Sequence, residues 1–271
     1  MTLQSADGAD FVIDRLDLSR HPLVEAVPIA VARPRTFDRC PICLDQNPVS
    51  REHVPPKSIG GDVMTHTCRR CNNRAGSVLE RALLDWWEDA LVSVRLSHEE
   101  VLGARRVPRI LLRQTRGGEP VFFCDDGLFD PAIAGKFLPG NRVTMSFQRP
   151  DPHRYRLAAL KSAYLGACLL LGEIPESPDA DEIRTEILAA RDLGPRKRPN
   201  ISERTARLQL SRSQGPAVPG EVALMETQSL SGQPGMAISL ARTLLVSWPL
   251  NGWFLGLNDD GKVLSTCRTS A

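Results

Sequence analysis

Apolar side chains recur at the spacing of one helical face between residues 79 and 94: Leu79, Leu83, Trp86, Trp87, Ala90, Leu91 and Val94. This period predicts an amphipathic helix, and Ser77 is a suitable N-cap residue just before it. Residues 157–171 are apolar almost all round, which is typical of a central, buried helix. Ser177-Pro178 begins a third, more polar helix that we expect to end near Arg191.

Other hydrophobic segments have the lengths and residue types of strands. Residues 109–113 and 120–123 flank Arg116-Gly117-Gly118, which predicts a hairpin, and residues 142–147 alternate as a third strand. Residues 1–36 hold short apolar pieces broken by prolines, so we expect an extended arm there.

The C-terminal part of the chain begins with a basic, proline-rich loop at residues 194–199. Five strands are predicted beyond it, at residues 206–211, 221–225, 237–248, 253–257 and 262–266. Residues 258–261 are a good turn between the last two. These alternating helical and strand patterns together predict an α+β protein that ends in antiparallel strands.

Composition limits the classes of protein that fit this pattern. The chain has 271 residues and 42% of them are hydrophobic, so it can bury a core and suits two modest domains. A net charge of only +2 excludes a heavily basic coat protein, so that any nucleic-acid surface must be local. No apolar run reaches the roughly 18 residues that a membrane span needs, and the N-terminus does not resemble a signal peptide. We therefore expect a cytoplasmic protein with no membrane partner.

Four cysteines form two Cys-x-x-Cys pairs with 24 residues between them: Cys40, Cys43, Cys68 and Cys71. Each pair turns tightly enough to aim two thiolates at one ion, and two pairs complete a tetrahedral zinc site. A closed site of this kind holds structure and performs no chemistry. The three other cysteines (Cys124, Cys168 and Cys267) fit no spacing rule, and we expect the first two to be buried thiols.

Candidate chemistry lies between and just after the two cysteine pairs. Glu52 and His53 are adjacent in a segment that suits a strand, where neighbouring side chains point to opposite faces. Asn72 follows the last cysteine, where a helix is expected to begin. Carboxylate and amide oxygens suit Mg²⁺ or Mn²⁺, and a neutral imidazole is a good general base.

The segment from Cys40 to about Ser77 resembles the HNH (ββα-metal) endonuclease superfamily in its four-cysteine, zinc-stapled form. The shared elements occur in order and cover roughly 40 of the 271 residues: Cys40 and Cys43, Glu52-His53 with Pro56, Gly60-Gly61, and Cys68, Cys71 and Asn72. The resemblance implies that His53 is the general base that activates water, and that Glu52 and Asn72 are ligands of a catalytic Mg²⁺ or Mn²⁺ ion.

The segment also departs from the family pattern. Many HNH proteins carry a histidine directly after the last cysteine pair and another four residues later, where this chain has Asn72 and Gly76. This argues against a His-rich transition-metal site and favours a magnesium site with several waters. Val63 and Met64 stand where the family's middle asparagine is often found, so the group that orients His53 is not evident from the sequence.

Basic residues surround the candidate site, with eight Lys or Arg against four Asp or Glu between residues 33 and 74, a local charge of +4. Such a patch suits the docking of a phosphate polymer, although a solvated face is the alternative. The nucleic-acid-binding candidates are Lys57, Arg69, Arg70 and Arg74.

We therefore expect an N-terminal arm (1–36), an HNH-like zinc and nuclease module with its following helix (37–98), and a mixed α/β accessory region (99–271). The expected activity is metal-dependent hydrolysis of phosphodiester bonds in DNA, or in RNA, with zinc in the structural site. The C-terminal region could mediate a homodimer or bind a partner protein. The alternatives are a non-catalytic nucleic-acid-binding zinc module, and the nuclease effector of a defence or mobile-element system.

Overall fold

The computed structural model of the chain describes residues 2–4, 10–12, 28–88, 90–114, 119–137, 141–193, 197–212, 216–228, 234–250, 253–257 and 263–268. Internal packing divides the chain into two units. Unit 1 comprises Met1–Ser19 and Asp85–Pro150, and unit 2 comprises Arg20–Leu84 and Asp151–Ala271. These limits differ from the boundaries at residues 36 and 98 that the sequence suggested, because the C-terminal half packs with the cysteine-rich segment.

Unit 1 is built on a four-stranded antiparallel sheet in the order β8-β7-β6-β9. Its strands are β6 (Ala90–Leu96), β7 (Ile110–Gln114), β8 (Pro120–Cys124) and β9 (Met145–Gln148). The unit also contains the short helix α3 (Pro131–Ala134) and the paired strands β1 (Thr2–Gln4) and β2 (Asp10–Val12). The predicted hairpin is confirmed by the pairing of β7 with β8, whereas its turn at 116–118 lies outside the described residues.

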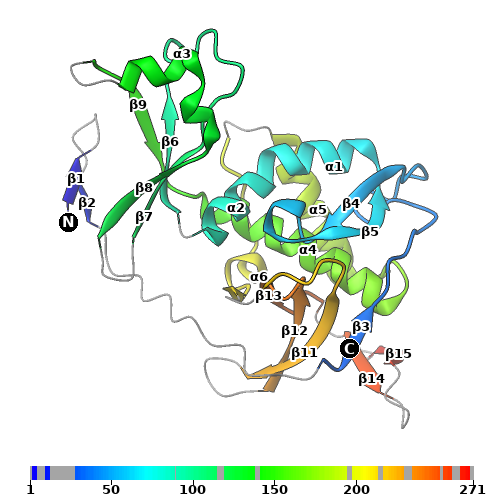
Figure 1. Cartoon of the computed structure of the whole chain (residues 1–271). Coiled ribbons are helices and arrows are strands. Elements are labelled where there is room, and N and C mark those ends of the chain that lie inside the picture. The colour runs from blue at the N-terminus through cyan, green and yellow to red at the C-terminus, as the bar shows by residue number, and fades with distance from the viewer. Residues whose placement is uncertain are drawn as a thin grey trace. The chain divides into compact units, whose positions relative to one another are not determined.

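Helix α4 (Pro152–Leu171) forms the centre of unit 2, as its apolar sequence predicted. Asp151 caps its first turn by accepting a hydrogen bond from the backbone of His153, and Pro152 follows at the position where a missing N–H costs nothing. Gly172 ends the helix with a left-handed φ of 74°, a conformation that glycine adopts without steric cost. Helix α5 (Pro178–Leu193) packs beside α4, also as predicted (Figure 1).

A five-stranded antiparallel sheet packs against α4 in the order β10-β13-β12-β11-β3. The strands are β3 (Ala30–Ala32), β10 (Leu210–Arg212), β11 (Val222–Gln228), β12 (Pro234–Leu240) and β13 (Leu244–Ser247). Gly166 allows the close approach of helix and sheet, because a Cβ atom there would lie 3.2 Å from Ile238 and Leu240. β14 (Trp253–Leu257) and β15 (Val263–Arg268) pair separately, and the predicted turn between them lies outside the described residues.

Two of the C-terminal predictions need correction. The expected strand at 206–211 is the short helix α6 (Glu203–Ala206) followed by β10, since Ser202 caps a helical turn there. The expected single strand at 237–248 is divided between β12 and β13, because Ala241 and Arg242 adopt left-handed φ angles of 52° and 54° and reverse the chain.

The cysteine-rich segment of unit 2 is a hairpin followed directly by a helix (Figure 1). β4 (Ser50–Val54) pairs antiparallel with β5 (Asp62–Thr67). One residue, Cys68, separates β5 from α1 (Arg69–Ala75). The helical turns continue through η2 (Gly76–Glu80) and α2 (Arg81–Trp87).

The helix expected near Asn72 is confirmed by α1, whereas the predicted cap at Ser77 and the helical assignment beyond Trp87 are wrong. Cys68, rather than Ser77, is the N-cap residue, because its sulfur accepts a hydrogen bond from the backbone of Cys71. The apolar stripe is helical only as far as Trp87. Ala90, Leu91 and Val94 belong to strand β6 instead, where the β-branched Val92 and Val94 favour extended backbone and β7 and β9 supply partners.

The loop that joins β4 to β5 is held by the five-stranded sheet. Thr243 donates its hydroxyl to the carbonyl of Ile59 at 2.7 Å, and a Cβ atom on Gly60 would lie only 2.6 Å from Ala217. The hairpin, α4 and the sheet therefore share one core. Within the described ranges, none of the helices combines the length and the apolar composition needed to cross a membrane.

Candidate metal centre

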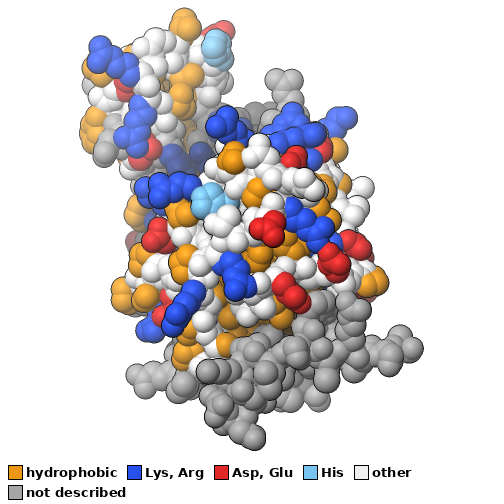
Figure 2. Space-filling model, turned by 90° about the vertical axis from the view of Figure 1, so that its right-hand side faces the viewer, with side chains coloured by type: hydrophobic (Ala, Val, Ile, Leu, Met, Phe, Trp, Pro, Cys, Tyr) orange, Lys and Arg blue, Asp and Glu red, His pale blue; other side chains and the backbone are white. Residues whose placement is uncertain are grey.

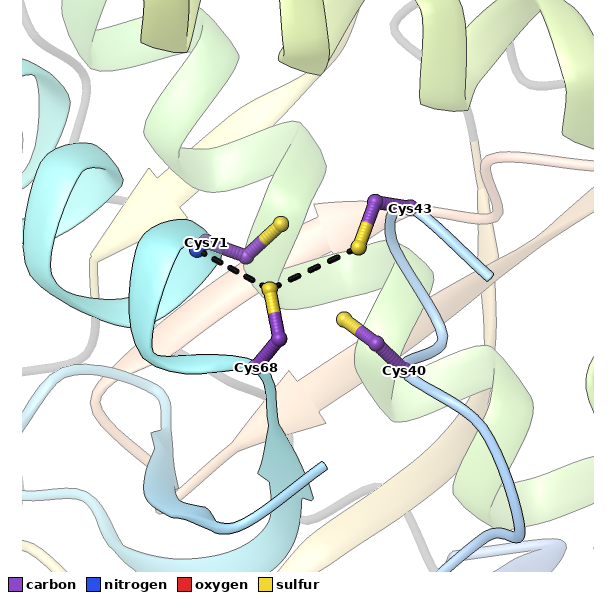
Figure 3. A group of neighbouring side chains, drawn as sticks. All are labelled: Cys40, Cys43, Cys68 and Cys71. Atoms are coloured by element: carbon purple, nitrogen blue, oxygen red, sulfur yellow. Dashed lines mark hydrogen bonds between the residues drawn. The ribbon is translucent and has the colours of Figure 1, made fainter. Parts of the chain in front are cut away.

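The four paired cysteines converge in unit 2, as their spacing predicted. Cys40 and Cys43 lie in a turn that precedes β4, while Cys68 and Cys71 lie at the junction of β5 and α1. Their sulfur atoms all lie within 4.8 Å of one another, and Figure 3 shows them pointing toward a common centre. Cys43 is half-buried and the other three are buried. In the described part of the chain, no second group of three or more His, Cys, Asp or Glu side chains converges in this way.

Local backbone turns aim each pair of sulfurs. In the first pair, Leu44 donates its N–H to the carbonyl of Cys40 at 2.8 Å and adopts a left-handed φ of 61°. In the second pair, the N–H of Cys71 points at the sulfur of Cys68 at 3.3 Å. The two cysteines of each pair lie on a single local turn, which explains why the spacing alone predicts the gathering of these side chains.

The donor set fits a tetrahedral ion such as zinc. Zinc–sulfur bonds of about 2.3 Å place the sulfurs about 3.8 Å apart in a tetrahedral site, and those of Cys43 and Cys68 are 3.5 Å apart. A hydrogen bond from Cys71 lowers the pKa of Cys40 to about 5, and the same bond raises the pKa of Cys71. Burial raises the pKa of Cys43 to about 11. Without a metal ion, these opposite shifts favour a thiolate at Cys40 and protonated thiols at Cys43 and Cys71. A divalent cation would instead bind all four groups as thiolates.

A guanidinium group that the sequence did not reveal adjoins this centre. Arg191, in the last turn of α5, donates Nη1 to the sulfur of Cys71 at 2.9 Å. Its Nε and Nη2 donate to the two carboxylate oxygens of Asp192 at 2.9 and 2.7 Å. Arg191 is buried, and no local pattern marks it, because its partner lies 120 residues away in the sequence.

Glu52 is a buried carboxylate with two side-chain partners. Its side chain is only 3% exposed, Lys161 of α4 donates to Oε1 at 2.8 Å, and Thr67 donates to Oε2 at 2.7 Å. The carboxylate is therefore engaged in a buried ion pair on the side of β4 that faces α4, and the role of Glu52 and Asn72 as ligands of one catalytic ion stays a prediction.

Lys161 joins Glu52 to a second carboxylate. Its Nζ also donates to Glu80 at 2.7 Å, and its side chain is 2% exposed. Burial alone would lower the pKa of Lys161, but the carboxylates of Glu52 and Glu80 raise it above its ordinary value. The sequence contained a signal for this cluster, because a single lysine within the apolar run 157–171 must find a buried partner.

His53 lies on the opposite face of β4 from Glu52. Glu52 and Val54 are buried, whereas Arg51 is exposed and His53 is half-buried, as the alternation of a strand requires. Asn72, on α1, donates Nδ2 to the hydroxyl of Ser50 at 2.8 Å and to the carbonyl of Arg51 at 2.7 Å. Both acceptors belong to the strand of His53, so Asn72 ties α1 to β4 and its amide oxygen is turned away from these two atoms.

The basic candidates differ in their surroundings. Lys57 and Arg69 are exposed. Arg70 and Arg74 pair with Asp192 of α5, at 3.1 and 3.5 Å, although more than half of each side chain stays exposed. Figure 2 shows Lys and Arg side chains intermixed with Asp and Glu on the drawn face. The positive charge around the cysteines is thus partly balanced by the C-terminal half of the chain.

The other cysteines show one further departure from expectation. Cys168 is buried, as predicted, and burial raises its pKa to about 12. Cys124 is exposed, because it is the last residue of the edge strand β8. The side chain of Cys267 lies outside the described residues.

Comparisons of the chain with protein-family models, with curated protein sequences and with solved structures find no match. The class of site therefore rests on geometry alone: four cysteines that could hold a metal ion such as zinc, at the junction of a hairpin and a helix.

Proposed function

We propose that unit 2 hydrolyses phosphodiester bonds in DNA, with zinc in the four-cysteine site as a structural ion. The support is the order of elements around that site, in which β4, β5 and α1 follow one another and the second cysteine pair lies at their junction. His53 lies on β4, and Asn72 of α1 is hydrogen-bonded to the two residues before Glu52. The sequence order that resembles an HNH nuclease thus coincides with a ββα arrangement.

In this proposal His53 is the general base that takes a proton from the attacking water. Its ring is half-buried on the outer face of β4, so a substrate can approach it without opening the core. A bound Mg²⁺ or Mn²⁺ ion would stabilise charge on the scissile phosphate. Asn72 offers its amide oxygen to such an ion, whereas Glu52 is engaged by Lys161 and Thr67 and anchors β4 instead. Lys57 and Arg69 are the exposed candidates for phosphate contacts.

The test compares cleavage of supercoiled plasmid DNA and of single-stranded RNA by the full-length protein, with and without Mg²⁺ or Mn²⁺. His53→Ala should slow metal-dependent nicking by roughly 100-fold or more, the usual contribution of a general base. His98→Ala replaces an exposed histidine of unit 1 and is the matched control, for which we expect the wild-type rate. Zinc content and melting temperature should not change in either variant. Nicking by His53→Ala at the wild-type rate would refute the assigned mechanism.

A second candidate is a zinc module that binds nucleic acid without cleaving it, and the burial of Glu52 favours it. An oxygen-ligated ion would have only Asn72 from the predicted ligand pair, since the Glu52 carboxylate already binds Lys161. If the protein has this second function, DNA binding should be salt-sensitive and neither ion should support nicking. The same plasmid assay therefore separates the two functions.

A further inference from the structure

A positively charged side chain of helix α5 contacts the four-cysteine centre. Arg191 donates Nη1 to the sulfur of Cys71 at 2.9 Å, and its side chain is only 7% exposed. Asp192 accepts from Nε and Nη2 of the same guanidinium group, at 2.9 and 2.7 Å. Because a guanidinium group is planar, this two-point contact fixes its plane and aims the third nitrogen at the sulfur.

Charge explains why such a donor matters. A divalent ion with four thiolates carries a net charge of −2, and three of the four cysteines are buried. Isolated charge in a buried site is costly unless an opposite charge or a hydrogen bond balances it. A charge-assisted hydrogen bond from a guanidinium group supplies both at once. Groups that hydrogen-bond to a metal ligand also fix the orientation of that ligand and tune the affinity of the site.

We infer that Arg191 is a positioning and charge-balancing residue of the metal centre, so that helix α5 is part of the zinc site. It draws charge from the sulfur of Cys71 and holds that sulfur toward the ion. This role requires only that the four cysteines bind zinc, and it does not require nuclease activity. Metal retention therefore tests it separately from the proposed function. It would stand if the hairpin cleaved no nucleic acid.

Arg191 could also act only by docking α5 onto α1, and its neighbour separates the two roles. Asp192 also pairs with Arg70 and Arg74 of α1, and these two pairs join α5 to α1 independently of the donor to Cys71. Replacing Arg70 and Arg74 together by Met weakens this docking but keeps Asp192, which orients Arg191, whereas Arg191→Met removes the donor to Cys71. Arg191→Lys retains a positive charge on a different geometry.

The experiment uses the full-length, zinc-loaded protein and measures transfer of zinc to a colorimetric chelator. Arg191→Met should lower the zinc affinity by roughly 10- to 100-fold, the usual cost of removing such a partner. Arg191→Lys should recover part of the loss, and the double variant Arg70→Met/Arg74→Met should stay near the wild type. The matched control is Arg204→Met, which removes the ion pairs of Arg204 with Asp179 and Glu182 and lies away from the cysteines.

Substitution of zinc by Co²⁺ gives a readout that docking alone would not move. The hydrogen bond lowers the energy of the sulfur electrons, so the thiolate-to-cobalt charge-transfer band should shift to lower energy in Arg191→Met and not in Arg70→Met/Arg74→Met. If Arg191→Met fails to fold, the band of Arg191→Lys decides the question. Equal zinc loss in Arg191→Met and in Arg70→Met/Arg74→Met, or an unmoved band in the folded Arg191 variant, would overturn the inference.

Discussion

A single buried lysine pairs with two carboxylates in the interior of unit 2. Lys161 is the one charged residue of the apolar run 157–171 in α4 and binds both Glu52 and Glu80, at 2.8 and 2.7 Å. Taking these charges from water is costly, and the cluster holds only while each member keeps its partner. The carboxylate that the sequence assigned to catalysis therefore serves to join β4 to α4.

Replacement of the lysine tests this function. Lys161→Met should lower the free energy of unfolding by about 3–5 kcal/mol, because it leaves the Glu52 carboxylate buried without a cation. The double variant Lys161→Met with Glu52→Gln should be more stable than the single variant, since the neutral amide removes the unpaired buried charge. Urea unfolding followed by circular dichroism measures both. Arg207→Met, which breaks an exposed pair with Glu203, should have little effect.

At the residue scale, the sequence predicts contacts between residues that are close to one another in the chain. The cysteine pairs are local turns, and their gathering follows from spacing. Lys161 and Arg191 act on Glu52 and Cys71 from more than a hundred residues away, so no motif connects them. The ion pair of Glu52 could not be predicted for this reason: Lys161 comes from α4, and the family resemblance ends long before that helix.

At the scale of elements, the hairpin depends on a very close backbone contact. A Cβ atom on Gly61 would lie 1.6 Å from the carbonyl oxygen of Pro55, so that no side chain fits between the two ends of the β4–β5 loop. Gly60 adopts a left-handed φ of 95° and faces Ala217. The two glycines thus allow a tight loop that also packs against the five-stranded sheet.

Gly61→Ala should therefore displace the loop and destabilise unit 2. We expect a loss of about 3 kcal/mol or more, because the clash involves backbone atoms that cannot rotate away. Gly135→Ala is the matched control, since a Cβ atom there meets nothing within 4 Å. Urea unfolding of the two variants measures the difference. A loss no greater than that of the control would mean that the loop relaxes freely.

Long, uniform patterns predicted elements correctly, and their limits were predicted less well. The apolar run of α4 and the capping sequence of α5 were sufficient to predict both helices. Periodicity could not show that the stripe from Leu79 changes from helix to strand after Trp87, because Ala90 and Val94 fit both periods. Pairing with β7 and β9, which lie later in the chain, decided that change.

At the scale of the whole molecule, the four-cysteine centre and the C-terminal half belong to one unit, although residues 85–150 lie between them in the sequence. The cysteines, β4, α4 and α5 all belong to unit 2, and residues 85–150 belong to unit 1. Zinc should therefore stabilise segments that lie far apart in the sequence, including α5 through Arg191. Zinc should change the stability of unit 1 little, because the four-stranded sheet of that unit contains none of the four cysteines.

Removal of the metal tests this division. Chelation, or the substitution Cys68→Ser, should reduce amide-exchange protection in β4, α1 and α5 together, because structural zinc contributes folding free energy of about 10–16 kcal/mol in small modules. Protection in β6 and β7 should stay near the wild-type level. Cys124→Ser, which changes an exposed thiol of unit 1, should leave both regions unchanged. Loss of protection confined to the cysteine turns would show instead that α5 is stable without the metal and that the two halves of unit 2 fold separately.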